Sequence, residues 1–174
     1  LEVEVSNGEH IYKQRYEKGT IVTDLEVIGT TTETGTTVTF KPDPTIFTDT
    51  TTYDYDILLN RLREQAFLNA GIRVVLTDRR TDEAISTIGK SDDLCFEGGI
   101  KSYVEFLLQG IKKEKLNSEV IYLNCEKDDQ TAEIALIWST AYDSKVMSFA
   151  NTLHTIDGGT HEQGFRQSLA NVVN

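Results

Sequence analysis

Long apolar stretches are missing from this sequence. It has no run of about eighteen apolar residues, the length that a membrane-spanning helix needs, so we predict no transmembrane segment. Its first residues lack the basic and apolar regions of a secretory signal peptide, and we expect a cytoplasmic protein. The two cysteines, Cys95 and Cys125, are expected to be isolated thiols, buried in a reducing cytosol and not joined in a disulfide.

Positive charge is scarce as well. The chain has 17 lysines and arginines against 28 aspartates and glutamates, a formal net charge of −11. Binding to duplex DNA draws much of its free energy from lysine and arginine at the phosphates. Short basic runs at Arg79-Arg80 and at 112–115 are typical of solvated surface. We therefore predict that this chain does not bind DNA strongly by itself.

Groupings of residues that carry catalysis are also lacking. The histidines His10, His154 and His161 have neither an i, i+4 partner histidine nor a cysteine pair, which argues against a zinc site. No serine stands in a nucleophile elbow. The acidic pairs at 92–93 and 128–129 fall in predicted loops, where solvated turns explain them. The sequence predicts no catalytic residue and no metal ligand in this chain.

The first part of the chain has the pattern of β-strands. Apolar and polar residues alternate around Asn7-Gly8, a dipeptide that tolerates the positive backbone angles of a tight turn, and this predicts a hairpin with strands near 1–6 and 9–17. Branched and aromatic residues predict two further strands, one just before Gly29 and one over 37–40.

A helical period begins near residue 54. Apolar residues recur every three or four positions and predict a helix of about four turns over 54–69. Thr51 with Asp54 has the spacing of a capping box, and Gly71 offers a left-handed stop.

Further elements are predicted beyond Gly71. Strands are expected at 72–77 and 84–88, followed by a polar boundary at 89–95 that carries no periodicity. A second unit then has a helix over about 100–109, strands near 120–125, 131–139 and 145–150, and a turn at 127–130. By the alternation of its strand, Trp138 should face a core or an interface.

The stretch FANTLHTIDGGTHEQGFRQSL is the most informative segment. Gly158 and Gly159 allow a sharp chain reversal, and Thr160 with Gln163 has capping-box spacing. The apolar residues of the helix that follows, from Phe165 to Val173, fall on one face, and we expect this helix to pack on a core.

This stretch resembles the GGTH segment of the ATPase subunits of bacterial type II DNA topoisomerases. The segments LEVEV, HIYKQRYEKGTIVTDLEVIGTT, ETGTTVTFKPDPTIF and FLNAGIRVVLTDRR resemble the same family in the same order, as does FEGGIKSYVEFL at 96–107. The resemblance covers nearly the whole chain without a break in order.

The resemblance implies an α+β fold in two parts. Residues 1–94 would form the later half of a GHKL (Bergerat) ATPase domain, a partial sheet with a packed helix. Residues 95–174 would form the first portion of a transducer domain, part of a ribosomal-protein-like α/β two-layer sandwich. The family's general base, magnesium-binding asparagine, adenine-reading aspartate and glycine-rich lid precede this region, and its phosphate-reaching lysine follows it. The parent protein would use ATP and Mg²⁺, and this chain alone is expected to be inactive.

The resemblance also gives roles to two strand residues. In the family, the threonine after the glycine of the ETGTT-like stretch lies on the floor of the adenine pocket and shares a bound water with the adenine-reading aspartate. That residue is Thr36 here. Val38 is two residues further on and therefore on the same strand face, where it would line the same pocket. On its residue type alone, Thr36 is equally an ordinary strand threonine.

Two other positions follow from the same comparison. Asn7 stands where the family commonly carries an arginine at the pocket rim that contacts coumarin-type inhibitors, so we expect weak coumarin binding. Gly98 and Gly99 end the segment 89–99 that joins the two units, and we predict a hinge there, with a plain linker as the alternative.

The function implied is that of a part of an ATP-dependent topoisomerase subunit that couples ATP binding and hydrolysis to DNA strand passage. The segment would form a wall of the nucleotide pocket and relay nucleotide state. Its partners would be a second copy of the same polypeptide, the A-type topoisomerase subunit, and DNA through the whole enzyme. The alternative is a non-catalytic protein-interaction module that retains the fold. A mismatch-repair or chaperone ATPase of the same superfamily is a third hypothesis, against which the pairing of TGTTV with GGTH argues.

Overall fold

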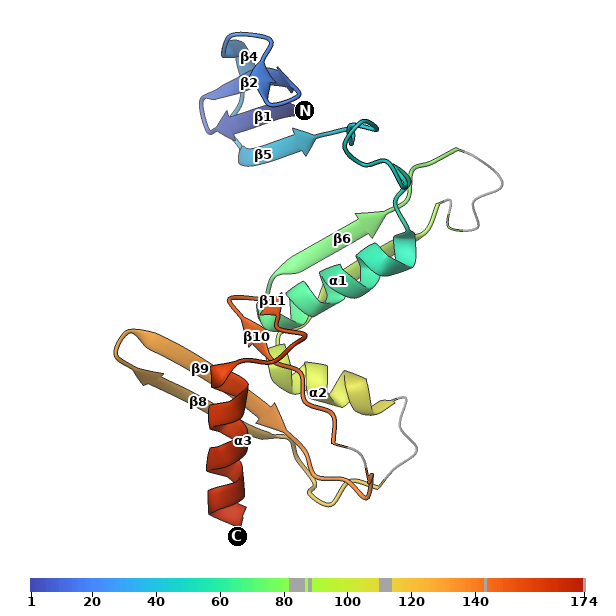
Figure 1. The fold of residues 1–174 in the computed structure, drawn as a ribbon. Coiled ribbons are helices and arrows are strands. Elements are labelled where there is room, and N and C mark those ends of the chain that lie inside the picture. The colour runs from blue at the N-terminus through green and yellow to red at the C-terminus, as the bar shows by residue number, and fades with distance from the viewer. Residues whose placement is uncertain (82–86, 88, 110–113, 143, 174) are drawn as a thin grey trace. The chain divides into compact units, whose positions relative to one another are not determined.

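The computed structural model describes residues 1–81, 87, 89–109, 114–142 and 144–173. These residues form three helices and several small antiparallel sheets, which confirms the predicted α+β class (Figure 1). They divide into two compact units, Leu1–Tyr53 and Asp54–Asn174. None of the helices in this part of the chain is long and apolar enough to cross a membrane.

The first unit is a five-stranded antiparallel sheet. Strand β1 (Glu2–Asn7) lies between β2 (His10–Glu17) and β5 (Thr34–Thr39). Strand β2 also pairs with β4 (Glu26–Thr30) and with the short β3 (Thr20–Ile21). The predicted hairpin and both further strands are confirmed, and β5 forms an edge of this sheet.

The β1–β2 turn is built differently from the prediction. Gly8 has a positive φ of 91°, but Asn7 does not share it. Instead, the Asn7 side-chain oxygen Oδ1 accepts hydrogen bonds from the backbone N–H groups of Glu9 at 3.0 Å and His10 at 2.9 Å. Asn7 thus does not use the positive angle that it tolerates, because it closes the turn with its side chain.

The second unit begins with helix α1 (Tyr55–Leu68), close to the predicted bounds. Its N-cap is Asp54, whose side chain accepts a hydrogen bond from the backbone N–H of Ile57 at 2.9 Å. Thr51 lies outside the helix start, so the capping box predicted from it is wrong. Gly71 has a φ of 82°, which confirms the left-handed stop.

A two-stranded sheet follows α1. Strand β6 (Arg73–Thr77) confirms the prediction, but β7 (Ser91–Cys95) pairs with it where a polar boundary without structure was expected. The sequence SDDLC has little strand propensity, and cross-strand contacts such as the ion pair between Arg73 and Asp93 compensate for it. The strand predicted at 84–88 falls on residues of which only Thr87 is described.

The core of this unit is a stack of aromatic rings around Phe67. This α1 side chain is 1% exposed and lies between Phe96, with ring centroids 3.7 Å apart, and Tyr103, at 4.8 Å. Phe106 contacts it at 5.5 Å. Tyr103 and Phe106 belong to helix α2 (Gly99–Gln109), whose bounds confirm the prediction. The stack thus joins α1, the segment after β7, and α2.

The strands after α2 form two hairpins. Strands β8 (Ile121–Lys127) and β9 (Gln130–Leu136) are joined by Asp128 and Asp129, with φ of 52° and 61°, the geometry of a tight hairpin turn. Strands β10 (Phe149–Ala150) and β11 (Leu153–His154) are short, so the strand predicted at 145–150 forms only at its last two residues. Trp138 is 42% exposed and is therefore not part of a core here.

Helix α3 (Thr160–Val173) follows the diglycine as predicted, but its start and its environment differ from expectation. The carbonyl of Gly159 accepts the N–H of Gln163 at 3.0 Å, so Gly159 and not Thr160 precedes the first turn. No α3 residue is buried, and Val172 is 83% exposed. The expected core packing of this helix is therefore not made by the described chain.

Both cysteine thiols are free, but the expectation that they are buried is wrong. Cys95, at the end of β7, and Cys125, in β8, are both exposed. In β7 the buried position is the neighbouring Leu94, whose side chain points to the other face, and most positions of β8 are exposed like Cys125.

Replacement of Phe67 by alanine should destabilise the second unit by about 3–5 kcal/mol, because it leaves a cavity between two stacked rings. Urea unfolding followed by the fluorescence of Trp138, the one tryptophan of the chain, measures this. Phe47→Ala is the control, since Phe47 is 57% exposed. A loss below about 1 kcal/mol for Phe67→Ala would show that the stack is not the core.

Candidate functional site

The three residues predicted to border a nucleotide pocket lie on one face of the first sheet. In the pairing of β1 with β5, Thr36 is opposite Val5, Val38 is opposite Val3, and Asn7 is opposite Thr34. Residues directly opposite each other in an antiparallel pair share a face, as do alternate residues of one strand. The register thus places Thr36, Val38 and Asn7 together at the edge of the sheet.

This face is apolar and open. Val5 and Val38 are 38% and 53% exposed, and the face continues through Tyr12 to Val27, which is 57% exposed. Thr36 contributes a hydroxyl to it. A largely apolar surface with a few uncharged polar groups suits a planar ring such as a nucleobase. The paired positions of β1 and β5 on this face carry no charged side chain, so they offer nothing that would hold a phosphate or Mg²⁺.

The opposite face of the same sheet is charged. The Lys13 ammonium nitrogen Nζ lies 2.7 Å from Glu2 and 2.9 Å from Glu4. The hydrogen bond from Lys13 lowers the pKa of Glu2, and the two carboxylates raise the pKa of Lys13. Ion pairs of this kind are typical of a solvated surface. The sheet therefore has one charged face that is solvated and one apolar face that a partner could cover. The candidate site lies on the apolar face.

Gly98 and Gly99 lie at the junction between β7 and α2. Gly99 is buried with a φ of 56°, and a Cβ there would lie 3.4 Å from the Cβ of Ala70. The N–H groups of Gly71 and Gly99 both donate to the carbonyl of Phe96, at 3.4 and 3.3 Å. The glycine thus allows α2 to start close against the end of α1. A hinge at this junction stays a prediction, and its pivot would adjoin the Phe67 stack.

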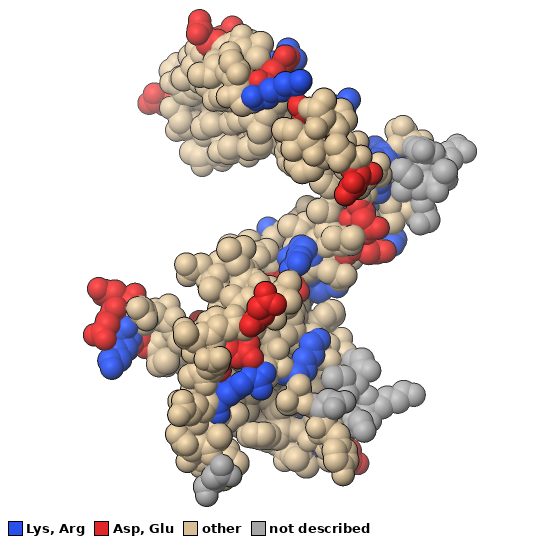
Figure 2. All heavy atoms as spheres, viewed as in Figure 1, with Lys and Arg blue, Asp and Glu red and all other residues tan. Residues whose placement is uncertain are grey.

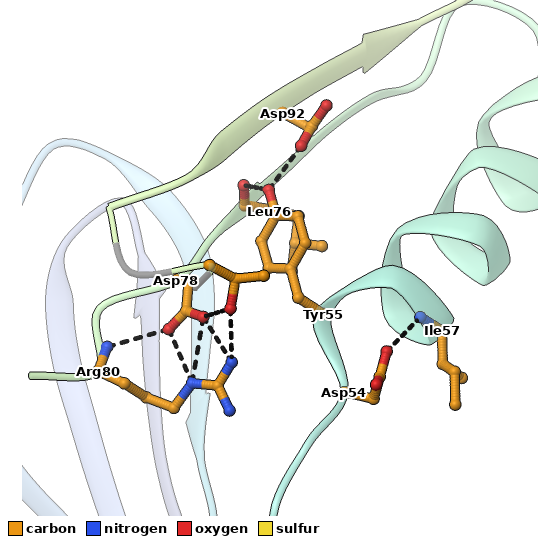
Figure 3. Close-up of polar contacts among 8 residues, drawn as sticks. Asp54, Tyr55, Ile57, Leu76, Asp78, Arg80 and Asp92 are labelled. Atoms are coloured by element: carbon orange, nitrogen blue, oxygen red, sulfur yellow. Dashed lines mark hydrogen bonds and ion pairs between the residues drawn. The ribbon is translucent and has the colours of Figure 1, made fainter. Parts of the chain in front are cut away.

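A polar cluster that the sequence did not indicate lies at the far end of β6 (Figure 3). The buried carboxylate of Asp78 accepts hydrogen bonds from the Arg80 side chain, from the Arg80 backbone N–H at 3.0 Å, and from the Thr87 hydroxyl at 2.7 Å. Hydrogen bonds from Arg80 and then from Thr87 hold the pKa of Asp78 well below its usual range. Arg80 is thus half-buried and paired with a buried carboxylate, and the prediction that it is merely solvated surface is wrong.

Tyr55 forms a second buried contact nearby, drawn in the same view (Figure 3). Its hydroxyl donates to the Asp92 carboxylate at 2.6 Å, across from α1 to β7. Burial, followed by the contact with Asp92, raises the pKa of Tyr55 to about 12. Asp92 therefore has a structural partner and does not lie in a solvated turn, as its sequence suggested. The Tyr55 contact fixes the β6–β7 sheet to α1, whereas the Asp78 cluster closes the connection between β6 and β7. Neither group is placed for catalysis.

Comparisons with known proteins fit this architecture. The sequence model of the DNA gyrase B family matches residues 99–174. Over all 174 residues the chain is 47% identical to DNA gyrase B of Streptococcus pyogenes serotype M1 and 46% identical to that of Staphylococcus aureus. It spans 26% of the length of each of these relatives.

A solved structure also matches. This is the 43K ATPase domain of Thermus thermophilus gyrase B in complex with an aminocoumarin, with a TM-score of 0.80 and 30% identity over 95% of this chain and 43% of that one. The fold class is thus the partial ATPase and transducer architecture of type II topoisomerase subunits. The chain belongs to the DNA gyrase B family, as a fragment of such a protein.

Replacement of Asp78 by asparagine should lower the melting temperature at pH 7 by roughly 5 °C, because the Arg80 guanidinium loses its buried partner. The native carboxylate, whose pKa is lowered, stabilises the fold fully above its ordinary pKa of about 4, and this contribution is lost as the pH falls below it. Asp78→Asn should therefore also flatten the loss of stability below pH 4, as measured by thermal melts across pH.

Asp93→Asn is the matched control for this prediction. Asp93 pairs with Arg73 at the exposed surface of the same sheet, so its loss should change the melting temperature little. Equal effects of the two substitutions would contradict a special role for the Asp78 cluster.

Proposed function

We propose that this chain forms a nucleotide-pocket wall and the first part of the relay in the ATPase subunit of a bacterial type II DNA topoisomerase. The parent enzyme couples ATP binding and hydrolysis to the passage of one DNA duplex through another, with supercoiling or decatenation as the result. The observation that carries the proposal is the placement of Thr36 and Val38 on one open apolar face, in a chain similar to DNA gyrase B along its whole length.

The proposal assigns the two predicted domains to this parent. Residues 1–94 are the later half of the ATPase domain, and residues 95–174 are the first portion of the transducer. Gly98 and Gly99 are the proposed hinge between them. The stacking of Phe67 on Phe96 and Tyr103 supports a relay role, because it makes α1 and α2 neighbours in one core.

The residues of the candidate site fit only one end of ATP. Thr36 and Val38 suit the adenine ring, through a hydroxyl and an apolar surface. Bound ATP would supply the phosphoanhydride whose cleavage drives the parent enzyme. The groups that hold its phosphates and Mg²⁺ belong to other parts of the parent in this proposal, so the 174-residue chain alone should hydrolyse no ATP.

The proposed partners are a second copy of the parent protein, the A-type topoisomerase subunit, and DNA, in the cytoplasm. Figure 2 supports a minor role of this segment in holding DNA, because the lysines and arginines on the face shown stand in small groups with acidic residues beside them. A continuous basic surface would be expected of a segment that grips phosphates.

The alternative is a non-catalytic interaction module that kept the fold. The open apolar face is compatible with it, because a protein partner could also cover that face. An assay of the parent protein with its A-type partner separates the two: ATP-dependent strand passage is the expected result, and its complete absence in an intact complex would favour the module.

Thr36→Val in the parent protein should weaken ATP binding about tenfold, because it removes one hydrogen-bonding hydroxyl and keeps the side-chain shape. Isothermal titration with a non-hydrolysable ATP analogue measures this. Thr37→Val is the matched control, since Thr37 is opposite Glu4 on the charged face of the same strand. Equal weakening by both variants would show that the hydroxyl of Thr36 has no specific role.

Asn7→Arg should tighten the binding of an aminocoumarin to the parent protein about tenfold or more, because it adds a planar cation at the pocket rim. Isothermal titration with the inhibitor measures the change. The same substitution removes the side-chain oxygen that closes the β1–β2 turn. Asn7→Ala, which loses the turn contact without adding a cation, is the control. If wild-type protein binds the inhibitor as tightly as Asn7→Arg does, then Asn7 is not a rim residue.

A further inference from the structure

The β10–β11 hairpin, Phe149–His154, is a small element that the proposed function does not use. Its turn consists of Asn151 and Thr152, with φ of 47° and 70°. Asparagine tolerates this region, but a β-branched threonine is an outlier there. A strained conformation persists only where the surrounding structure stabilises it. The contacts of this turn therefore point to the role of the hairpin.

The turn is held by helix α1. The side-chain amide nitrogen Nε2 of Gln65 donates a hydrogen bond of 2.9 Å to the carbonyl of Thr152, across 87 positions of sequence. The amide is partly buried in this contact. Phe149 of the hairpin also lies beside Tyr103 of the aromatic core, with ring centroids 6.4 Å apart. Two neighbouring contacts thus fix the hairpin to the α1–α2 layer.

The other end of the hairpin is fixed to helix α3. The Ser148 hydroxyl donates to the Glu162 carboxylate at 2.7 Å and lies 2.7 Å from the Thr155 hydroxyl. Glu162 is also paired with Arg166 at 2.8 Å within α3. The Thr155 backbone N–H closes the hairpin on the Ser148 carbonyl at 2.9 Å. The first turn of α3 is therefore anchored to the base of this hairpin.

These contacts matter because α3 has no buried side chain to hold it in place. The position of its first turn is set mainly by Glu162 and the diglycine, and both depend on the hairpin. A displacement of α1 would reach α3 through Gln65, the turn, and the Ser148–Glu162 contact.

We infer that the β10–β11 hairpin is a coupling element that ties helix α3 to helix α1, with Gln65 as its positioning residue. The inference rests on the proposed function in so far as α1 belongs to the ATPase half and α3 to the transducer. In that setting the hairpin carries nucleotide-dependent movement of α1 into the transducer. Gln65 touches neither nucleotide nor DNA.

The test is hydrogen exchange in the full parent protein with Gln65→Leu, a change that keeps side-chain size and helix propensity. Loss of the hydrogen bond to the Thr152 carbonyl should speed hydrogen exchange of the Thr155 and Gln163 amides about five- to tenfold. This factor corresponds to the net free energy of one hydrogen bond. Gln109→Leu, the same change at an exposed position of α2, should leave both amides unchanged. Unchanged exchange at Gln163 in Gln65→Leu would overturn the inference.

A second variant separates the effect of the Gln65 hydrogen bond from the effect of backbone strain in the turn. Thr152→Asn keeps the carbonyl that Gln65 holds and places at φ 70° a residue that tolerates it. Exchange at Gln163 should stay at the wild-type rate or slow. An increase equal to that of Gln65→Leu would mean that the turn side chain, and not Gln65, holds the hairpin, and would contradict the assignment.

The coupling role has its own readout. With the A-type partner, Gln65→Leu should at least double the ATP consumed per strand-passage event and leave affinity for the ATP analogue unchanged. An unchanged ratio together with faster exchange at Gln163 would overturn the coupling role. If the wild-type parent hydrolyses no ATP, the proposed function fails, and the exchange result still decides whether the hairpin ties α3 to α1.

Discussion

The second unit depends on the burial of one ring. Phe67 is the largest fully buried side chain of the described residues, and it lies between Phe96 and Tyr103. These three residues come from α1, from the segment after β7, and from α2. With few other buried side chains, this stack decides how the two helices meet and where the β6–β7 sheet ends. The buried contacts of Asp78 and Tyr55 extend the same layer toward the other end of the sheet.

The first unit is organised by the two faces of its sheet and not by a core. Charged residues alternate with apolar ones along β1, so Glu2 and Glu4 meet Lys13 on one side while Val3 and Val5 point to the other. In an intact globular protein such an apolar face is covered. Its exposure here, in a chain that spans 26% of its relatives, fits a sheet whose cover comes from elsewhere in the parent. Thr36 and Val38 lie on this apolar face, so what covers it in the parent also decides what contacts these two residues.

Sequence patterns predicted the elements whose own residues determine them. The α1 helix, the β1–β2 and β8–β9 hairpins, and the shared face of Thr36 and Val38 depend on local period and turn chemistry, and each could be read directly. Strand β7 could not, because SDDLC has little strand propensity of its own and its partners, β6 with Arg73 and α1 with Tyr55, are distant in sequence. The prediction that α3 packs on a core was wrong for a similar reason. Amphipathic spacing predicts an apolar helix face, but it does not say whether the surface that covers this face belongs to the same chain.

The contrast between the two glycine-containing segments bears on where movement can arise. At Gly99, the backbone packs against Ala70 beside the Phe67 stack, so a change of angle there must repack aromatic rings. The GGTH segment is different, because its contacts are hydrogen bonds between Ser148, Thr155 and Glu162 at the surface of the unit. Hydrogen bonds at a partly solvated site exchange with water at small net free-energy cost, whereas a packed core resists continuous deformation. A hinge motion at Gly98 and Gly99 would therefore have to repack the aromatic stack, whereas the hairpin and the diglycine can follow a movement of α1 at a smaller free-energy cost.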